Sequence, residues 1–290
     1  MFRTRFAPSP TGYLHLGHAL SALTVAHFAR QAGGEMLLRI ENTDFTRCRD
    51  EYESAIFDDL DWLGLDWPTP VRRQTAHFPE YKKALQKLID AHVVYRCFLS
   101  RKELMTIIDS NPEMSAHGPD GPVYFGQPLP ASEEAHLIEQ GTPFAWRLSI
   151  RAARDMLCTD WSDISYAERS SGGEMLVARH KATPEIFGDA VIARKDIGTS
   201  YHLASVHDDA LQGITHVIRG DDLKQAVHLH RLLQVLLDLP EPVYQHHRLL
   251  TDDAGKKLSK RDESPSLKQM RESGVRTADV KAQIADLLQD

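Results

Sequence analysis

Residues 5–18 read RFAPSPTGYLHLGH, and this stretch decides the fold. Residues 3–7 are typical of a short strand, which must end at Pro8 and Pro10. Apolar residues then recur at helical spacing over residues 14–29. A strand that turns directly into a helix is where a doubly wound parallel sheet opens its ligand crevice.

The alternation of strand and helix patterns continues downstream. Compact apolar runs predict strands at residues 36–40, 93–97, 189–194, 215–219 and 243–250. Amphipathic patterns predict helices at residues 52–63, 81–91, 200–208 and 221–237, and shorter ones at about 265–273 and 277–289. This order predicts an α/β fold of Rossmann type, with a parallel sheet and helices on both of its faces.

The pattern loosens in the middle of the chain, where prolines and glycines are frequent from residue 98 to about residue 185. We interpret this part as a smaller insertion. The expected divisions are a first half of the catalytic domain at 1–97, the insertion at 98–188, a second half at 189–250, and a loop with C-terminal helices at 251–290.

Composition favours a globular cytoplasmic protein with no membrane partner. The 290 residues are 42% apolar and 26% charged, without an apolar run long enough for a bilayer and without a signal peptide pattern. The three cysteines are too scattered for a disulfide framework or a CxxC metal site. A net charge of −7 gives no sign of a nucleic-acid partner, so RNA binding would need a local basic surface. A monomer is the default expectation.

The first chemical motif is the pair His15 and His18, which lie three residues apart at the start of the expected helix. The free N–H groups and the dipole of a helix N-terminus favour phosphate, and two imidazole donors strengthen that preference. Gly17 allows a ligand to approach the backbone closely. The alternative is two ordinary polar residues near a helix start, but the spacing behind a Pro-Thr-Gly turn favours the functional interpretation.

The second motif is KKLSKR at residues 256–261, which follows the turn-forming residues DDAG. Lysines on such a loop can swing onto the phosphates of a nucleotide. Alone, the string is common on protein surfaces. Together with the upstream histidines it predicts ATP contacts from Lys257, Ser259 and Lys260, in addition to His15, Gly17 and His18.

The third motif is a set of polar residues at expected strand ends and helix starts: Arg5, Glu41, Tyr201 and Arg219. Arginine binds carboxylates through two parallel contacts, so two arginines suit a substrate with two carboxylates, such as glutamate. Glu41 could hold the ammonium group. The alternative for each residue alone is ion pairing at a strand end.

Longer stretches resemble the glutamyl-tRNA synthetases, a class I family. Similar to that family are residues 5–18, 38–44 (LRIENTD), 201–209 (YHLASVHDD) and 213–223 (GITHVIRGDDL), and KLSKR resembles the KMSKS element. The resemblance spans residue 3 to about residue 261 and implies a Rossmann-type class I catalytic domain that uses ATP with Mg²⁺. It also implies a glutamate site made by Arg5, Ala7, Ser9, Glu41, Tyr201 and Arg219.

In the reaction that the resemblance implies, a glutamate carboxylate attacks the α-phosphate of ATP, and His15, His18 and Lys260 stabilise the developing charge. The sequence stops about thirty residues after KLSKR, without the helical anticodon-binding domain of glutamyl-tRNA synthetases. It is thus similar to the glutamyl-queuosine tRNA(Asp) synthetases, which implies glutamate activation without tRNA and transfer to queuosine at the wobble position of tRNA(Asp). The alternatives are a truncated glutamyl-tRNA synthetase that charges a tRNA 3′ end, a nucleotidyltransferase with an HxGH turn, and a non-catalytic relic.

Many members of this family carry zinc in the insertion, held by a Cys-x-Cys pair, a tyrosine and a later cysteine. Cys97 and Tyr124 correspond to two of these ligands, whereas Leu99 and Pro128 replace the other two. Neither leucine nor proline has a side-chain ligand atom, and zinc needs about four ligands. We therefore expect no zinc and assign no metal ligands. The alternative is a compensating site from two histidines that lie nearby in sequence, His117 and His136.

Overall fold

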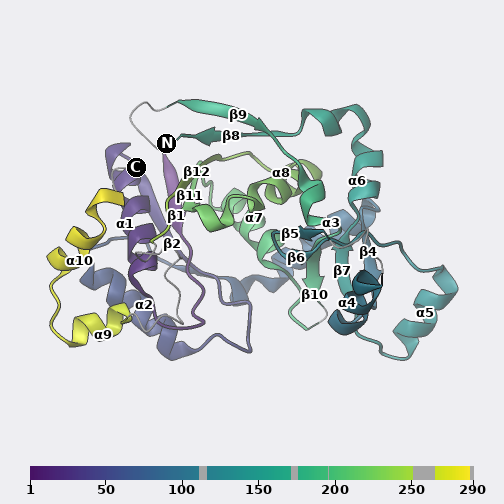
Figure 1. The fold of residues 1–290 in the computed structure, drawn as a ribbon, viewed down its shortest axis with the longest axis horizontal. Coiled ribbons are helices and arrows are strands. Elements are labelled where there is room, and N and C mark those ends of the chain that lie inside the picture. Colours follow the sequence, from purple (N-terminus) through teal and green to yellow (C-terminus); the bar gives the residue numbers. More distant parts are fainter. Residues whose placement is uncertain (111–115, 171–175, 195, 251–264, 288–290) are drawn as a thin grey trace.

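The computed structural model describes residues 1–110, 116–170, 176–194, 196–250 and 265–287, and Figure 1 shows its fold. The described strands are β1 (Arg3–Phe6), β2 (Glu35–Ile40), β3 (Arg72–Arg73), β4 (Val94–Cys97), β5 (His117–Gly118), β6 (Gly121–Pro122), β7 (Ala145–Leu148), β8 (Ser165–Arg169), β9 (Val177–Lys181), β10 (Val191–Arg194), β11 (His216–Gly220) and β12 (Val243–His247).

The described α-helices are α1 (Leu16–Gln31), α2 (Asp50–Trp62), α3 (Phe78–Asp90), α4 (Arg101–Asp109), α5 (Ala131–Glu139), α6 (Ile150–Leu157), α7 (Tyr201–Leu211), α8 (Ala226–Leu237), α9 (Leu267–Glu272) and α10 (Thr277–Gln283). Short 3₁₀ turns cover Gln74–His77, Cys158–Asp163, Pro184–Phe187, Asp221–Leu223 and Ala285–Leu287. No helix in the described part of the chain has the length and apolar character that a membrane span requires.

The parallel sheet that the sequence predicts is present in two pieces that lie side by side. Strands β1, β2 and β3 are parallel, and so are β11 and β12. The amide of Thr215, just before β11, donates to the carbonyl of Arg3 in β1 at 2.9 Å. The carboxyl ends of β1, β2 and β11 therefore meet at one edge, where parallel sheets place their ligands.

Two predicted strands differ from expectation in their pairing. β4 and β10 both pair antiparallel with β7, which comes from the expected insertion. This sheet crosses the expected divisions at residues 97 and 188, so the division of the chain stays a proposal. A short apolar run predicts a buried strand but carries no information about the direction of its partner.

Element boundaries also shift for local reasons. The first helix begins at Leu16 rather than at residue 14, because the His15 side chain caps it. The helix expected at residues 221–237 starts instead with a 3₁₀ turn, and α8 begins at Ala226. β12 ends at His247 rather than at residue 250.

Helices α9 and α10 lie against α1 and α2, so the C-terminal part of the chain packs beside its N-terminal part (Figure 1). The amide of Leu267 donates to the carbonyl of Leu14 at 2.8 Å. Leu267 and Val280 are buried in the same hydrophobic cluster as α1 and α2. This contact places Leu267 close to the start of α1.

Candidate active site

A pocket of about 420 Å³ opens at the edge where β1, β2 and β11 end and where α1 and α7 begin. Nine of the predicted site residues line it: Arg5, Ala7, Ser9, His15, Gly17, His18, Glu41, Tyr201 and Arg219. The other three predicted residues, Lys257, Ser259 and Lys260, lie outside the described residues. The structure thus brings the predicted phosphate and amino-acid residues into one cavity.

His15 and His18 form a reciprocal cap at the start of α1. Nδ1 of His15 accepts from the amide of Gly17 at 3.1 Å, and Nδ1 of His18 accepts from the amide of His15 at 3.2 Å. The two ring centroids are 3.9 Å apart. Because both Nδ1 atoms are acceptors, each neutral ring carries its proton on Nε2 and can donate it to a phosphate oxygen.

The structure gives a second reason for a glycine at position 17, beside the one that the sequence suggests. A β-carbon at this position would lie 3.0 Å from Cε1 of His15, so the histidine ring occupies the space beside the glycine. The expectation was that a ligand approaches the backbone here. The absent side chain also lets the His15 ring cap the helix, and the approach of a ligand at Gly17, which lines the pocket, stays a prediction.

Arg5 is held at the pocket wall by a buried carboxylate. Its Nε donates to Oδ1 of Asp209 in α7 at 2.9 Å, and its Nη2 donates to Oδ2 at 3.4 Å. Both side chains are at most 8% exposed. The ion pair lowers the pKa of Asp209, although burial opposes it, so the pair stays charged.

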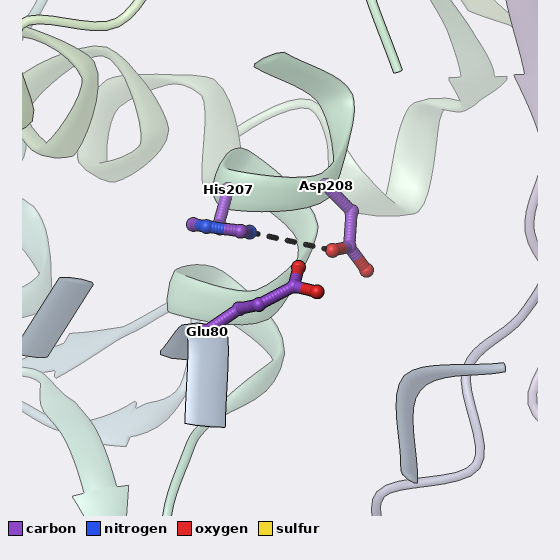
Figure 2. Close-up of side chains that lie close together, drawn as sticks. All are labelled: Glu80, His207 and Asp208. Atoms are coloured by element: carbon purple, nitrogen blue, oxygen red, sulfur yellow. Dashed lines mark hydrogen bonds and ion pairs between the residues drawn. The ribbon is translucent and has the colours of Figure 1, made fainter. Parts of the chain in front are cut away.

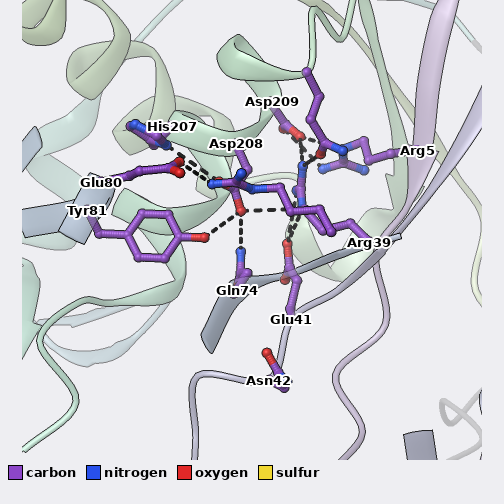
Figure 3. A network of polar contacts seen from close by, with 12 residues as sticks. Arg5, Arg39, Glu41, Asn42, Gln74, Glu80, Tyr81, His207, Asp208 and Asp209 are labelled. Atoms are coloured by element: carbon purple, nitrogen blue, oxygen red, sulfur yellow. Dashed lines mark hydrogen bonds and ion pairs between the residues drawn. The ribbon is translucent and has the colours of Figure 1, made fainter. Parts of the chain in front are cut away.

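Glu41 is positioned in the same way by Arg39, which sequence reasoning did not single out. Nη2 of Arg39 donates to Oε1 of Glu41 at 3.0 Å, and its Nη1 donates to Asp209 at 2.7 Å. Arg39 is fully buried. Burial raises the pKa of Glu41, while Arg39 and Arg5 oppose that rise. Arg39 therefore joins both walls of the pocket through Asp209 and Glu41 (Figure 3).

Asp208 extends this network away from the pocket. Its carboxylate accepts from Nε of Arg72 at 2.9 Å. It also accepts from Gln74 at 3.0 Å and from the Tyr81 hydroxyl at 2.8 Å (Figure 3). Burial raises the pKa of Tyr81, and the charge of Asp208 raises it further. The two adjacent aspartates of α7 therefore bind on two sides of the helix: Asp209 binds Arg5 at the pocket, and Asp208 binds side chains from β3 and α3.

One group of side chains in the described part of the chain is close enough to share a metal ion, namely Glu80, His207 and Asp208 (Figure 2). Nδ1 of His207 lies 3.4 Å from Oδ1 of Asp208. The Arg72 guanidinium contacts both carboxylates of this group. Because a fixed cation already neutralises them, we interpret the group as an ion-pair network.

Arg219 lies at the end of β11 and is 4% exposed. Its Nη1 donates to the Tyr201 hydroxyl at 3.2 Å, and its Nε donates to Nε2 of His246 at 3.4 Å. Its Nη2 is buried without a hydrogen-bond partner among the described residues, which also offer it no ion pair with a carboxylate. A buried, uncompensated guanidinium favours an anionic ligand.

The region that resembles a zinc site has no cluster of ligands in the described part of the chain. Cys97 is buried. Burial raises the pKa of Tyr124, and the neighbouring Cys97 raises it further. Leu99 is 37% exposed and, like Pro128, has no ligand atom. The prediction that no zinc binds here stays a prediction.

Comparisons with known proteins agree with the motifs. Residues 1–284 match the family model described as the catalytic domain of class I tRNA synthetases (E and Q). A glutamyl-Q tRNA(Asp) synthetase from Rhodobacter capsulatus is 42% identical over 96% of this chain and 98% of its own length. A glutamate–tRNA ligase from Synechococcus is 36% identical over 99% of this chain and 58% of its own length.

Solved structures give the same fold. A glutamate-tRNA synthetase from Elizabethkingia anophelis aligns with a TM-score of 0.70 and 28% identity, covering 90% of this chain and 53% of that one. A glutamate tRNA ligase from Elizabethkingia meningosepticum, solved in complex with its amino acid, aligns with a TM-score of 0.69 and 27% identity over 94% and 53% of the two chains. The chain spans about half the length of these ligases and nearly all of the R. capsulatus relative.

Proposed function

Because the chain belongs to the class I tRNA synthetases of the glutamate and glutamine type, which are ligases, we propose that it activates L-glutamate with ATP and transfers the glutamyl group to queuosine of tRNA(Asp). Activation proceeds without tRNA in this proposal. Nine of the predicted site residues line one pocket, and the acceptor is proposed from the name of the R. capsulatus relative, a glutamyl-Q tRNA(Asp) synthetase.

The observation that carries the proposal is the state of Arg219. Its guanidinium is buried, its partners are the neutral groups of Tyr201 and His246, and the described residues offer it no carboxylate. A cation in this setting gains more from a carboxylate than one exposed to water, because the surrounding dielectric is low. Arg219 therefore binds the side-chain carboxylate of glutamate.

The rest of the pocket complements the other groups of the amino acid. Arg5 faces the cavity as a second guanidinium, and Glu41 adds a carboxylate. Among the residues predicted to bind the amino acid, two guanidinium groups and one carboxylate match the two carboxylates and the single ammonium of glutamate. Glutamine offers only one carboxylate to the two guanidinium groups. Ala7 and Ser9 complete this wall of the pocket.

In the activation step a carboxylate oxygen of glutamate bonds to the α-phosphorus of ATP. The bond from that phosphorus to the bridging oxygen breaks, which gives glutamyl-adenylate and pyrophosphate. His15 and His18 donate hydrogen bonds from Nε2 to phosphate oxygens as charge develops. Lys260 of the KLSKR motif, which lies outside the described residues, assists them. A magnesium ion bound with the triphosphate would neutralise part of its charge, with ligands from phosphate and water as well as from the protein.

The test of activation is glutamate-dependent exchange of pyrophosphate into ATP with no tRNA added. We expect exchange with glutamate and none with glutamine or aspartate. Arg219→Leu removes the cation and keeps an apolar side chain of moderate size, so exchange should be lost while the protein remains folded. Exchange that requires tRNA(Glu) would favour a truncated glutamate–tRNA ligase. If no amino acid supported any exchange, the proposal would be excluded.

The acceptor is tested separately with labelled glutamate. Transfer should occur to tRNA(Asp) that carries queuosine and should be absent with the same tRNA lacking the modification. Removing the 3′-terminal adenosine should leave transfer intact, because the queuosine hydroxyl is the acceptor. Transfer that depends on the 3′ end instead would assign the chain to tRNA charging.

A further inference from the structure

Arg219 and His246 are direct neighbours across the sheet. β11 and β12 are parallel, and the register places Arg219 opposite His246. Nε of Arg219 donates to Nε2 of His246 at 3.4 Å, and both residues are buried. The sequence analysis singled out the arginine but gave no role to the histidine.

A third strand completes the contact. Nδ1 of His246 lies 2.8 Å from Oε1 of Glu168, which comes from β8 on the other side of β12. Glu168 is itself held by Lys224 at 3.2 Å and approached by His180 at 3.6 Å. A chain of polar contacts thus crosses three adjacent strands and ends at the guanidinium that faces the pocket.

We propose that His246, oriented by Glu168, is a positioning residue that fixes the Arg219 guanidinium for the side-chain carboxylate of the amino-acid substrate. The inference rests on the proposed function, since it assumes that Arg219 binds that carboxylate. It adds two residues, His246 and Glu168, that line neither the predicted phosphate site nor the predicted ammonium site.

The chemistry fixes the tautomer of His246. An arginine Nε–H can only donate, so Nε2 of His246 must be the unprotonated nitrogen. The proton then lies on Nδ1, where it is donated to the Glu168 carboxylate. A carboxylate that holds one ring nitrogen of a histidine and sets the role of the other is a common device for fixing ring orientation.

The charges around the ring agree with a neutral histidine. Burial lowers the pKa of His246, and Arg219 and Lys224 lower it further, while Glu168 acts in the opposite direction. The same contacts with His246 and Lys224 lower the pKa of Glu168 to about 2, so its carboxylate stays ionised. The neutral ring neither repels the guanidinium nor compensates its charge, which leaves that charge for the substrate.

Two polar groups therefore hold Arg219 from two directions. The Tyr201 hydroxyl accepts from Nη1 and His246 accepts from Nε, so the plane of the guanidinium is set by two atoms. The remaining Nη2 is the donor that has no partner among the described residues. Loss of the His246 contact would free the side chain to rotate and would leave its Nε buried without an acceptor.

The experiment compares His246→Leu with His246→Gln in glutamate-dependent pyrophosphate exchange. Leucine keeps most of the volume and removes the acceptor, whereas the glutamine carbonyl oxygen can accept where Nε2 does. We expect His246→Leu to raise the KM for glutamate by about tenfold or more, as for a lost hydrogen bond to a charged group. The KM for ATP should change less than about twofold, and His246→Gln should restore most of the affinity.

His180→Gln is the matched control, because His180 approaches Glu168 but is half exposed and does not contact Arg219. It should leave the KM for glutamate unchanged. An unchanged KM in His246→Leu overturns the proposal, and so does a KM for ATP that rises as much as the KM for glutamate. Wild-type protein that shows no glutamate-dependent exchange would instead refute the proposed function.

A second measurement determines the tautomer in the wild-type protein and uses a variant only to assign the His246 signals. Nitrogen-15 spectra of the wild-type protein report which ring nitrogen of each histidine carries the proton, and the His246 signals are identified by their loss in His246→Gln. We expect a neutral ring protonated at Nδ1. A ring protonated at Nε2, or at both nitrogens at pH 7, would overturn the inference because it could not accept from Arg219.

Discussion

His15 has two tasks at the scale of a single residue: its Nδ1 caps α1, and in the proposed reaction its Nε2 donates to a phosphate oxygen. His15→Asn separates them. Asparagine is a good N-cap, so helix and fold should persist with little change in Tm. The variant loses the imidazole donor, so kcat of glutamate-dependent exchange should fall by about 100-fold, as for loss of one preorganised donor.

His27→Asn is the control for this substitution, since His27 lies on the same helix but is exposed. It should leave kcat unchanged within about twofold, the effect expected of a surface substitution. If His15→Asn instead lowered Tm strongly and left kcat per folded molecule intact, His15 would be a capping residue alone.

The pocket residues differ in how far sequence could predict them. Arg5 and Glu41 were predictable because they end expected parallel strands, where ligands bind. Arg39 and His246 were not, because a buried charged or polar side chain is explained only by a partner that the fold brings to it. The partner of Arg39 is Asp209, 170 residues away, and the register of two strands pairs His246 with Arg219.

At the scale of elements, Arg39 links β2 to α7 and thereby sets the width of the pocket. Arg39→Met keeps the length of the side chain but leaves Glu41, Asp208 and Asp209 as buried carboxylates without their shared cation. Breaking one partner of a buried ionic network costs about 3–5 kcal/mol of the free energy of unfolding. Urea denaturation at pH 7 measures this loss.

Arg3→Met is the matched control, because Arg3 pairs with Glu35 on the neighbouring strands but its side chain is 36% exposed. A surface ion pair contributes less than about 1 kcal/mol, so this variant should unfold almost as the wild type does. Equal losses in the two variants would show that Arg39 is an ordinary ion pair.

A second link joins α2 to α9 and gives a pH-dependent prediction. Burial raises the pKa of Asp59 to about 6 despite its contact with Arg271. An unfolded aspartate has a pKa of about 3.9. Between about pH 4 and pH 6 the folded protein therefore holds a proton on Asp59 that the unfolded chain has lost. The free energy of unfolding falls as the pH rises through this range. Asp59→Asn removes the buried charge and should raise the free energy of unfolding at pH 7 by about 1–3 kcal/mol.

The gain should vanish as the pH falls toward 4, where the wild-type carboxyl is already protonated, and urea denaturation at both pH values tests this. Asp58→Asn is the control, because Asp58 also contacts Arg271 but its side chain is 57% exposed. It should change stability by less than about 0.5 kcal/mol at either pH. A gain at pH 7 that persists unchanged at pH 4 would contradict the assignment to Asp59 ionisation.

The elements themselves were largely predictable, but their partners were less so. Hydrophobic periodicity located β1, α1, β2 and α3 to within a few residues, because each buries one face or stripe. It could not place β4 in an antiparallel sheet with β7, since that pairing joins strands about 50 residues apart and depends on the tertiary fold. The hydrophobic pattern predicts whether a segment forms a strand or a helix, whereas long-range contacts determine which elements it packs against.

At the scale of the whole molecule, the two proposed half-reactions differ in how their substrates respond to the charge of the protein. The net charge of −7 opposes long-range attraction of tRNA, so binding has to come from local contacts between basic side chains and phosphates. Glutamate, in contrast, meets Arg219 inside the protein, where salt screens little.

Raising the KCl concentration should therefore affect the two substrates differently. With about three phosphate contacts, an increase from about 50 mM to about 200 mM KCl raises the KM for queuosine-bearing tRNA(Asp) by roughly 10- to 100-fold. The KM for glutamate in exchange without tRNA should change less than about twofold over the same range. Steady-state kinetics of transfer and of exchange measure both values. If the KM for glutamate rose in parallel with the KM for the tRNA, glutamate would be binding where solvent ions screen it. That outcome would contradict binding at Arg219, because Arg219 is buried.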